Sequence, residues 1–353
     1  MTHILGMDIG GTKMAAAVVD DGGSVILRRE LATPAAAGGP AVLAAAGTLA
    51  TQLLADAAGA GLAVAGLGIG TAGIVDPQRG AVLSATDTLP GWAGTELGAG
   101  LQERLGIPVR VINDVHAHAL GESWCGAGRG SASLLLVAVG TGVGGSFVLD
   151  GSPLTGARHA AGHAGHLASP HAAGLDCSCG AAGHVEAIAA GPAILRSYWR
   201  LAAAVPEDSR KVGEPRNVRD ARDVCLLADQ GDAHAAEAVR LSAAATGQLV
   251  GGLSNMLDPD VVVISGGVSR AGRRWWQAMD DAVRAELLTA LAGLPVRAAL
   301  LGEDAGVIGA ARFAWDAHFT PGSKSGSNPK SNPKSNPGPV PGFAAAGGSR
   351  AHS

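Results

Sequence analysis

Lysine is scarce in this sequence of 353 residues. Only five lysines occur, and three of them lie beyond residue 320, so Lys13 and Lys211 are the two in the body of the chain. The formal net charge is −4, and no basic patch or stripe stands out. We therefore expect no nucleic-acid partner. Against this scarcity, a lysine inside a glycine-rich segment is conspicuous.

Long hydrophobic runs are missing as well, although 47% of the residues are hydrophobic. The longest apolar stretches, such as residues 134–139, end within a few residues at glycine. None approaches the roughly 20 residues that span a bilayer. The segment after Met1 has no basic region and no leader cleavage site. We expect a cytoplasmic protein without a membrane partner.

Cysteine is the third scarce residue type, with four copies at positions 125, 177, 179 and 225. A cytoplasmic protein rarely holds a structural disulfide, so the close pair Cys177 and Cys179 favours metal binding. Cys125 and Cys225 are interpreted as buried helix residues. The chain length fits about two domains with a sizeable core.

The pattern of apolar residues and turn residues predicts an α/β protein. Residues 3–19 and 133–149 each read as strand, glycine turn and strand, a weak internal repeat that indicates two related lobes. The other predicted strands cover residues 24–30, 62–70, 109–112 and 261–264. The predicted helices cover residues 40–58, 115–124, 191–201, 218–230, 233–257 and 307–315.

The composition changes sharply at about residue 320. Ser-Asn-Pro-Lys begins at Ser327 and is repeated at once. Such a sequence buries little apolar surface and is typical of disorder. We expect residues 320–353 to form a disordered tail.

The first candidate site is the turn after the first strand, which contains Asp8, Gly10, Gly11, Thr12 and Lys13. Glycines let backbone N–H groups approach a phosphate closely, and the threonine and lysine add donors. A carboxylate at a strand end suits Mg²⁺, which prefers oxygen ligands. An ordinary hairpin turn is the alternative interpretation.

A second glycine-rich turn covers residues 140–145, again between two strands. Its alternative is also a plain tight turn, but two such turns together favour a triphosphate held from both sides. A third glycine pair follows the strand 261–264 and is a weaker signal. The residues expected at the nucleotide are Thr141, Gly142, Gly144, Gly266 and Gly267.

Asn113 and Asp114 stand between a strand and a helix. A carboxylate at the carboxyl end of a strand is well placed for a crevice between lobes. Phosphoryl transfer needs a group that orients the attacking hydroxyl and accepts its proton, and Asp114 suits this role. Asn113 can bind a neighbouring hydroxyl. The alternative is that the pair simply caps the following helix.

A cluster of potential metal ligands comprises His166, Cys177, Cys179 and His184. Two thiolates and two imidazoles form a four-coordinate set that suits Zn²⁺. Four protein ligands leave no open position, so the predicted zinc is structural. A surface loop with free thiols and incidental histidines is the alternative.

Taken in order, these motifs resemble the ROK family (repressors, open reading frames and kinases), part of the actin-like ATPase superfamily with the hexokinases. The resemblance runs from about Ile4 to Trp315. It rests on residues 8–13, 68–76, 89–92, 113–114, 140–145, 264–267 and on the His/Cys cluster with Glu186.

The resemblance implies a two-lobed α/β fold, ribonuclease H-like in each lobe, with a cleft that closes on substrate. The implied lobes are residues 1–115, joined by the C-terminal helix 307–318, and residues 116–306 with a zinc loop at 166–184. The implied ligands are ATP, Mg²⁺ and a sugar, and the implied assembly is a homodimer or homotetramer.

The resemblance also implies residue roles. Asp114 is implied as the catalytic base, and Asn113, His166 and Glu186 as ligands of the sugar. The family's usual glutamate near the sugar is His163 here, the third zinc cysteine is His184, and the usual asparagine before Leu-Pro-Gly-Trp is Thr88, after Asp87. His163, Asp87 and Thr88 are therefore further candidate sugar contacts.

The function that follows is an ATP-dependent sugar kinase of the glucokinase type. Its expected substrate is glucose or an N-acetylhexosamine such as N-acetylglucosamine or N-acetylmannosamine. A sugar-responsive regulator is one alternative, although Asp8 leaves no room before it for a helix-turn-helix domain. A catalytically silent sugar-binding protein is the other.

Overall fold

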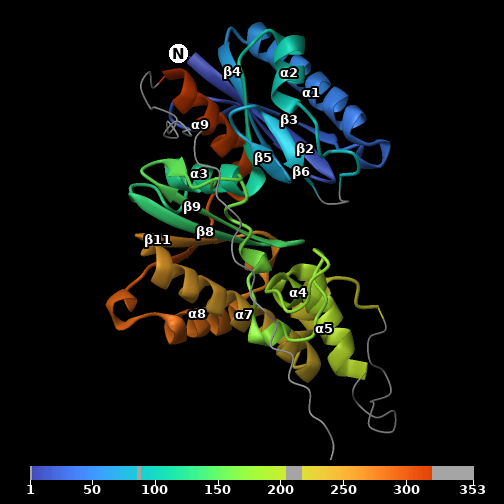
Figure 1. Ribbon diagram of the computed structural model, residues 1–353, viewed down its shortest axis with the longest axis vertical. Coiled ribbons are helices and arrows are strands. Elements are labelled where there is room, and N and C mark those ends of the chain that lie inside the picture. The colour runs from blue at the N-terminus through green and yellow to red at the C-terminus, as the bar shows by residue number, and fades with distance from the viewer. Residues whose placement is uncertain (1, 86–88, 204–216, 320–353) are drawn as a thin grey trace, which may run out of the picture.

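The computed structural model describes residues 2–85, 89–203 and 217–319. These residues form two five-stranded sheets and one two-stranded ribbon, with helices on both faces of each large sheet. Figure 1 shows the sheets in two separate lobes, with helices α3 and α9 between them. The predicted disordered tail, residues 320–353, lies outside the described residues.

The first sheet has the strand order β3-β2-β1-β4-β7. The strands β1, β4 and β7 run parallel, whereas β1, β2 and β3 form an antiparallel meander. Their bounds are β1 Thr2–Ile9, β2 Lys13–Val19, β3 Val25–Ala32, β4 Ala63–Thr71 and β7 Val109–Asn113. The carboxyl ends of the three parallel strands therefore meet at one edge of the sheet.

The faces of this sheet are covered by different helices because side chains alternate along each strand. On β1, Leu5 and Met7 join a core with α1 (Gly39–Gly59) and α2 (Leu97–Leu105). Ile4 joins the opposite core, formed with α9 (Ala305–Phe319). A short ribbon of β5 (Ile74–Asp76) and β6 (Ala81–Ser84) leads from β4 toward α2.

Helix α1 corrects one expectation, because by length and composition it is long and apolar enough to cross a membrane. One such helix is weak evidence, since the core helices of soluble proteins pass the same criteria. Its Val42, Leu49 and Leu53 are buried against the first sheet. We interpret α1 as a core helix.

The second sheet has the order β10-β9-β8-β11-β12. Its strands are β8 Ser133–Val139, β9 Val143–Leu149, β10 Ser152–Pro153, β11 Val261–Ser265 and β12 Val296–Ala298. Alternation again separates two cores: Leu135 and Val137 face the outer helices, and Leu134 and Leu136 face α3 (Asp114–Cys125). The outer helices are α4 Glu186–Ala189, α5 Gly191–Ala203, α6 Ala221–Asp229, α7 Ala233–Leu257 and α8 Arg273–Glu286.

The layer between the sheets consists of α3 and α9, which pack tightly on each other. The contact depends on glycine: a Cβ atom at Gly309 would lie 1.7 Å from the carbonyl oxygen of Ala117. On the other side of α9, a Cβ atom at Gly68 would lie 1.8 Å from the carbonyl oxygen of Ala310. Both distances are far below van der Waals contact, so only glycine permits this close packing of backbone on backbone.

The predicted strands and helices are confirmed, with bounds that differ by a few residues. Helices α2, α4 and α8 and the short strands β5, β6, β10 and β12 were not predicted. Helix α8 buries Trp275, Met279 and Val283, a spacing of four that marks one helical face. Cys125 and Cys225 lie on helices as expected, but they are half-buried rather than buried.

Candidate active site

Two carboxylates meet where the parallel strands of the first sheet end. Asp8 pairs with Gly70 in the register of β1 and β4, and Asp114 follows β7 directly. A Cβ atom at Gly70 would lie 3.8 Å from Asp8 Oδ1 and 3.6 Å from the Cα of Asp114. Asp8 and Asp114 thus both lie beside Gly70, close enough for the charge of Asp8 to act on Asp114.

The electrostatic surroundings of Asp114 favour its protonated form. Burial, followed by the negative charge of Asp8, raises the pKa of the Asp114 carboxyl above its ordinary value. The charge of His118 and the N–H of Val115, at 2.8 Å from Asp114 Oδ1, act in the opposite direction. A raised pKa is typical of a carboxylate that accepts a proton in catalysis.

His118 is a neighbour of both carboxylates that sequence reasoning missed. Its Nε2 lies 3.6 Å from Asp8 Oδ2. Burial acts to lower the pKa of His118, but its interactions with Asp8, Asp114 and Glu122 outweigh burial and raise that pKa. His118 stands four residues after Asp114, hence on the same face of α3, and this spacing could have identified it.

Asn113 caps helix α3. Its Oδ1 accepts from the N–H of Val115 at 2.9 Å and of His116 at 3.3 Å, and its Nδ2 donates to the carbonyl of Gly73 at 2.9 Å. The capping interpretation is confirmed for this side chain. A further role as a sugar ligand stays a prediction.

The first glycine turn is held by its own backbone and by Thr33. The N–H of Gly10 donates to the carbonyl of Lys13 at 3.0 Å, and Thr33 Oγ1 donates to the carbonyl of Gly10 at 2.7 Å. Gly11, which is half-buried, and Thr12, which is exposed, form the tip between β1 and β2. The tip is accessible to a phosphate, as its predicted role requires.

Lys13 is engaged with carboxylates in this structure rather than free. Its Nζ lies 3.1 Å from Glu30 Oε1 and 2.8 Å from Glu303 Oε2. The hydrogen bonds with Glu303 and Glu30 raise the pKa of Lys13. Exposed ion pairs of this kind contribute little stability, about 0–1 kcal/mol, so they do not bar the ammonium from a phosphate.

The second glycine turn lies beside the third glycine pair and a large cavity. A Cβ atom at Gly140 would lie 3.8 Å from the N of Gly267, and one at Gly266 would lie 2.3 Å from the carbonyl oxygen of Val139. The cavity has a volume of about 810 Å³, and its lining includes Thr141 and Gly267. The second glycine turn and the third glycine pair thus border a space large enough for a nucleotide, whereas no residue of the first glycine turn lines it.

The second turn also reaches the start of helix α3. A Cβ atom at Gly144 would lie 3.0 Å from Val115 Cγ2, one residue after Asp114. Glycine at this position therefore lets strand β9 approach the start of α3 closely. The second glycine turn thus leads into a strand that packs on the residue after the predicted base.

Glu186, a predicted sugar ligand, begins helix α4 next to this turn. Its Oε2 accepts from the N–H of Val143 at 2.9 Å. A Cβ atom at Gly142 would lie 2.6 Å from the same oxygen. Glu186 therefore lies directly against the second glycine turn, between the phosphate and zinc-loop regions.

His163, which stands in for the family's glutamate, has a defined tautomer. Its Nδ1 lies 3.0 Å from the carbonyl oxygen of Ala160 and must donate there, because a carbonyl only accepts. The neutral ring then presents Nε2 as an acceptor. His163 also stacks with His166, with ring centroids 6.1 Å apart. Asp87 and Thr88 lie outside the described residues.

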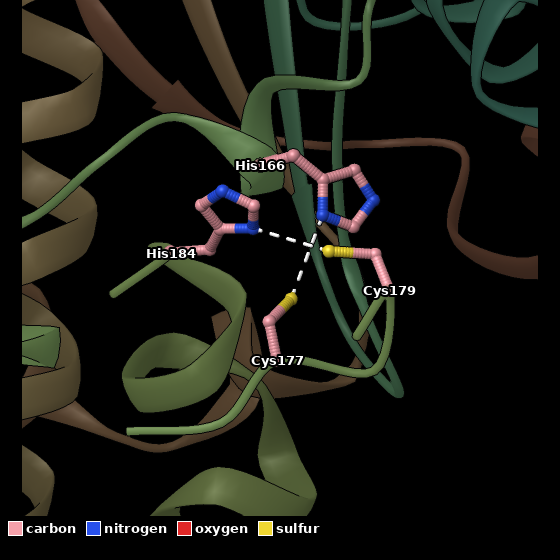
Figure 2. A group of neighbouring side chains, drawn as sticks. All are labelled: His166, Cys177, Cys179 and His184. Carbon is pink, nitrogen blue, oxygen red and sulfur yellow. Dashed lines mark hydrogen bonds between the residues drawn. The ribbon is translucent and has the colours of Figure 1, made fainter. Parts of the chain in front are cut away.

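The predicted zinc ligands converge on one point (Figure 2). Cys177 Sγ lies 3.5 Å from His166 Nδ1, and Cys179 Sγ lies 3.3 Å from His184 Nδ1. All four ligand atoms lie within 4.8 Å of one another. These separations fit a tetrahedral ion with Zn–S bonds of about 2.3 Å and Zn–N bonds of about 2.0 Å. His166 uses Nδ1 here, which leaves Nε2 for a second partner.

The molecule has two lobes, each with a glycine turn on its sheet, and the carboxylate of Asp114 begins the helix between the sheets. This arrangement is the actin-like ATPase class of fold, which confirms the predicted fold class. The chain belongs to the ROK family, whose family model matches residues 4–317.

Similarity to individual proteins agrees with this membership. The chain is 36% identical to a glucokinase of Halalkalibacterium halodurans, covering 69% of this chain and 74% of the relative. It is 34% identical to an N-acetylmannosamine kinase of Yersinia pseudotuberculosis, covering 88% and 97%. A solved structure of a ROK family glucokinase from Streptomyces griseus with glucose and AMPPNP is 32% identical, has a TM-score of 0.68, and covers 88% of this chain and 98% of that one.

Proposed function

We propose that this protein is an ATP-dependent sugar kinase that transfers the terminal phosphoryl group of ATP to a hydroxyl of a hexose or an N-acetylhexosamine. The observation that carries the proposal is the position of Asp114, a carboxylate of raised pKa that interacts with Asp8 and directly precedes Val115, the residue packed against Gly144 of the second glycine turn. Similarity to a glucokinase and an N-acetylmannosamine kinase supports both candidate substrate classes.

In the proposed reaction, the residues of this chain position the two substrates and move one proton. The second glycine turn and Gly267 border the nucleotide, and the first turn receives the terminal phosphate. Asp114 orients the sugar hydroxyl and accepts its proton as the oxygen–phosphorus bond forms and the bond to ADP breaks. When bound, Mg²⁺ would neutralise phosphate charge, and Asp8 would hold it.

The sugar is proposed to lie at the other end of the same cleft. Its proposed ligands are Glu186, His166 and His163, together with Asn113, which precedes the proposed catalytic base Asp114. With Nδ1 directed at the carbonyl of Ala160, Nε2 of His163 is the ring atom proposed to accept a hydrogen bond from a sugar hydroxyl, as a glutamate does. This supports glucose and N-acetylhexosamines alike, so the choice between them rests on experiment.

The test is an ADP-release assay with glucose, mannose, fructose, N-acetylglucosamine and N-acetylmannosamine, each with MgATP. We expect one of them to give a kcat/KM at least tenfold above the rest, because one misplaced polar contact costs about 1–3 kcal/mol. Sugar binding without turnover would instead support a silent sugar-binding protein. Neither binding nor turnover with any sugar would contradict the proposal.

Three further properties complete the proposal. The zinc site is proposed as structural, the protein as cytoplasmic, and the assembly as a homodimer or homotetramer. The lobe boundary at residues 115 and 116 also stays a prediction; helix α9 packs on the first sheet, as the predicted joining helix 307–318 requires.

A further inference from the structure

The carboxylate of Glu186 is held at both oxygens by donors from two different segments. Oε2 accepts from the N–H of Val143 in the second glycine turn, at 2.9 Å. Oε1 accepts from the hydroxyl of Ser178. Within residues 2–85, 89–203 and 217–319, Glu186 has no ion-pair partner. These two hydrogen bonds therefore fix the direction of the carboxylate.

Ser178 stands between two of the proposed zinc ligands, Cys177 and Cys179. Its hydroxyl must be the donor to Glu186, because an ionised carboxylate only accepts. Hydrogen bonds to a charged acceptor are shorter and about twice as strong as neutral ones. Through Ser178, the predicted zinc loop 166–184, called the metal loop, is thus bonded directly to a proposed sugar ligand.

The loop that carries Ser178 is a tight hairpin. The N–H of Cys177 donates to the carbonyl of Ala181 at 2.7 Å, and the N–H of Gly180 donates to the carbonyl of Cys177 at 3.0 Å. An isolated antiparallel bridge joins Asp176 and Ala182. The two thiols each lie beside a histidine, so a bound metal would fix Ser178 from both sides.

We propose that Ser178 is a positioning residue for the sugar site: its hydroxyl aims the Glu186 carboxylate and couples the order of the metal loop to sugar affinity. This inference rests on the proposed function. A purely structural role would let Ser178 stabilise the loop and the metal without any effect on the sugar. The two roles therefore differ in which constant changes when the hydroxyl is removed.

The experiment compares Ser178→Ala, Ser178→Thr and the wild type, with Ser152→Ala as a control at an exposed serine on strand β10. For Ser178→Ala we expect the sugar KM, and the sugar Kd measured calorimetrically without ATP, to rise about tenfold. This corresponds to about 1.4 kcal/mol for one lost charge-assisted hydrogen bond. The KM for ATP and the zinc content should stay within twofold of the wild type.

Ser178→Thr retains the hydroxyl and should restore the sugar Kd to within about threefold, whereas Ser152→Ala should change nothing. Chelation provides a second measurement. Removing the metal should raise the sugar Kd of the wild type strongly. The rise should be smaller in Ser178→Ala, because the Glu186 carboxylate is already released there and only the effect through His166 remains.

Two results would overturn the inference. One is an unchanged sugar Kd in Ser178→Ala, with or without loss of zinc. The other is an equal effect of chelation in the wild type and Ser178→Ala. A wild type that neither binds nor phosphorylates any sugar would instead refute the proposed function, so the two failures are distinguishable. If Ser178→Ala does not fold, the sugar Kd of Ser178→Thr is measured before and after chelation instead. Its retained hydroxyl should give the same rise in Kd as in the wild type, and a different rise would overturn the inference.

Discussion

At the scale of single residues, Asp114 is subject to two opposing demands. A proton acceptor has to be ionised when it acts, yet burial and the nearby charge of Asp8 raise its pKa and penalise the ionised form. The folded protein therefore holds a carboxylate in a position that lowers its stability. Such sites are expected where function and stability compete.

Asp114→Asn removes the proton acceptor and is expected to lower kcat by about 10²–10⁴-fold. The sugar Kd should change little, because the amide keeps the shape of the side chain. A calorimetric Kd beside a steady-state kcat checks both. Near-normal turnover would remove Asp114 as the base.

The same variant is expected to be more stable at neutral pH. A carboxyl whose folded pKa lies above its unfolded pKa favours folding below the unfolded value and loses that contribution as the pH rises through the folded value. At pH 7 the wild type therefore bears the cost of the ionised group. Thermal unfolding should show a higher Tm for Asp114→Asn at pH 7, and the gain should shrink toward pH 3.

His116 gives a stability signal of opposite sign. Burial lowers the pKa of this histidine to about 4, and its Nδ1 lies 2.9 Å from Ser146 Oγ. The contribution of His116 to the free energy of unfolding is therefore complete above about pH 6.5. It is lost as the pH falls through about 4, by as much as about 3 kcal/mol.

Denaturant unfolding at pH 7 and pH 4.5 tests this dependence in His116→Asn. Its free energy of unfolding should fall less between the two pH values than that of the wild type. His234→Asn, at a half-buried helix position, is the control and should show the wild-type fall. Identical falls in all three proteins would contradict the role of His116.

At the scale of elements, the metal loop is the segment with the clearest independent chemistry. Its four potential ligand atoms lie within 4.8 Å of one another, and a zinc ion bound by all four would have no position left for a substrate. The loop between β10 and α4 has little regular structure of its own, so a bound ion would supply much of its order.

Metal analysis of the purified protein is expected to find about one zinc per chain. Replacing Cys177 and Cys179 together by Ser should abolish it, since a hydroxyl is a poor zinc ligand. The matched control is Cys225→Ser, on helix α6. A fully folded wild type without metal would refute the zinc assignment.

At the scale of the whole molecule, the lobes are joined by helices that contact through glycine. Helix α9 lies against both the first sheet and α3, and α3 lies against the second sheet. Glu122 adds a polar link: its Oε1 accepts from the N–H of Leu301 at 2.8 Å, and its Oε2 from that of Leu300 at 3.1 Å. The chain segment that returns from the second lobe is thus fixed to α3.

Gly309→Ala should disrupt this layer, because its Cβ would fall 1.7 Å from a backbone oxygen that cannot move alone. We expect a loss of about 1–3 kcal/mol or more in the free energy of unfolding. Gly252→Ala on α7, where a Cβ meets nothing within 4 Å, is the control and should gain about 0.5–1 kcal/mol. Denaturant unfolding measures both, and equal stability of the two variants would contradict the packing argument.

The outcome of sequence reasoning depended on whether a signal was local. The turn around Asp8, the Asn113 cap and the His166–His184 cluster have fixed spacings, and the structure brings each together. The position of His118 four residues after Asp114 could have identified it as a site residue, but it was not predicted. No sequence pattern indicated the hydrogen bond between Ser178 and Glu186. The engagement of Lys13 with Glu303 joins residues 290 positions apart and could not be predicted.

By itself, the sequence determined most of the strands and helices, the glycine turns and the residue types of the site. These follow from backbone conformation and from periodic burial, which act over a few residues. Only the tertiary structure decided that Asp8 lies close enough to act on Asp114 and that Glu186 is held between the metal loop and the second glycine turn. Such contacts depend on how sheets and helices pack across the chain, and their distances are set by the shape of the whole fold.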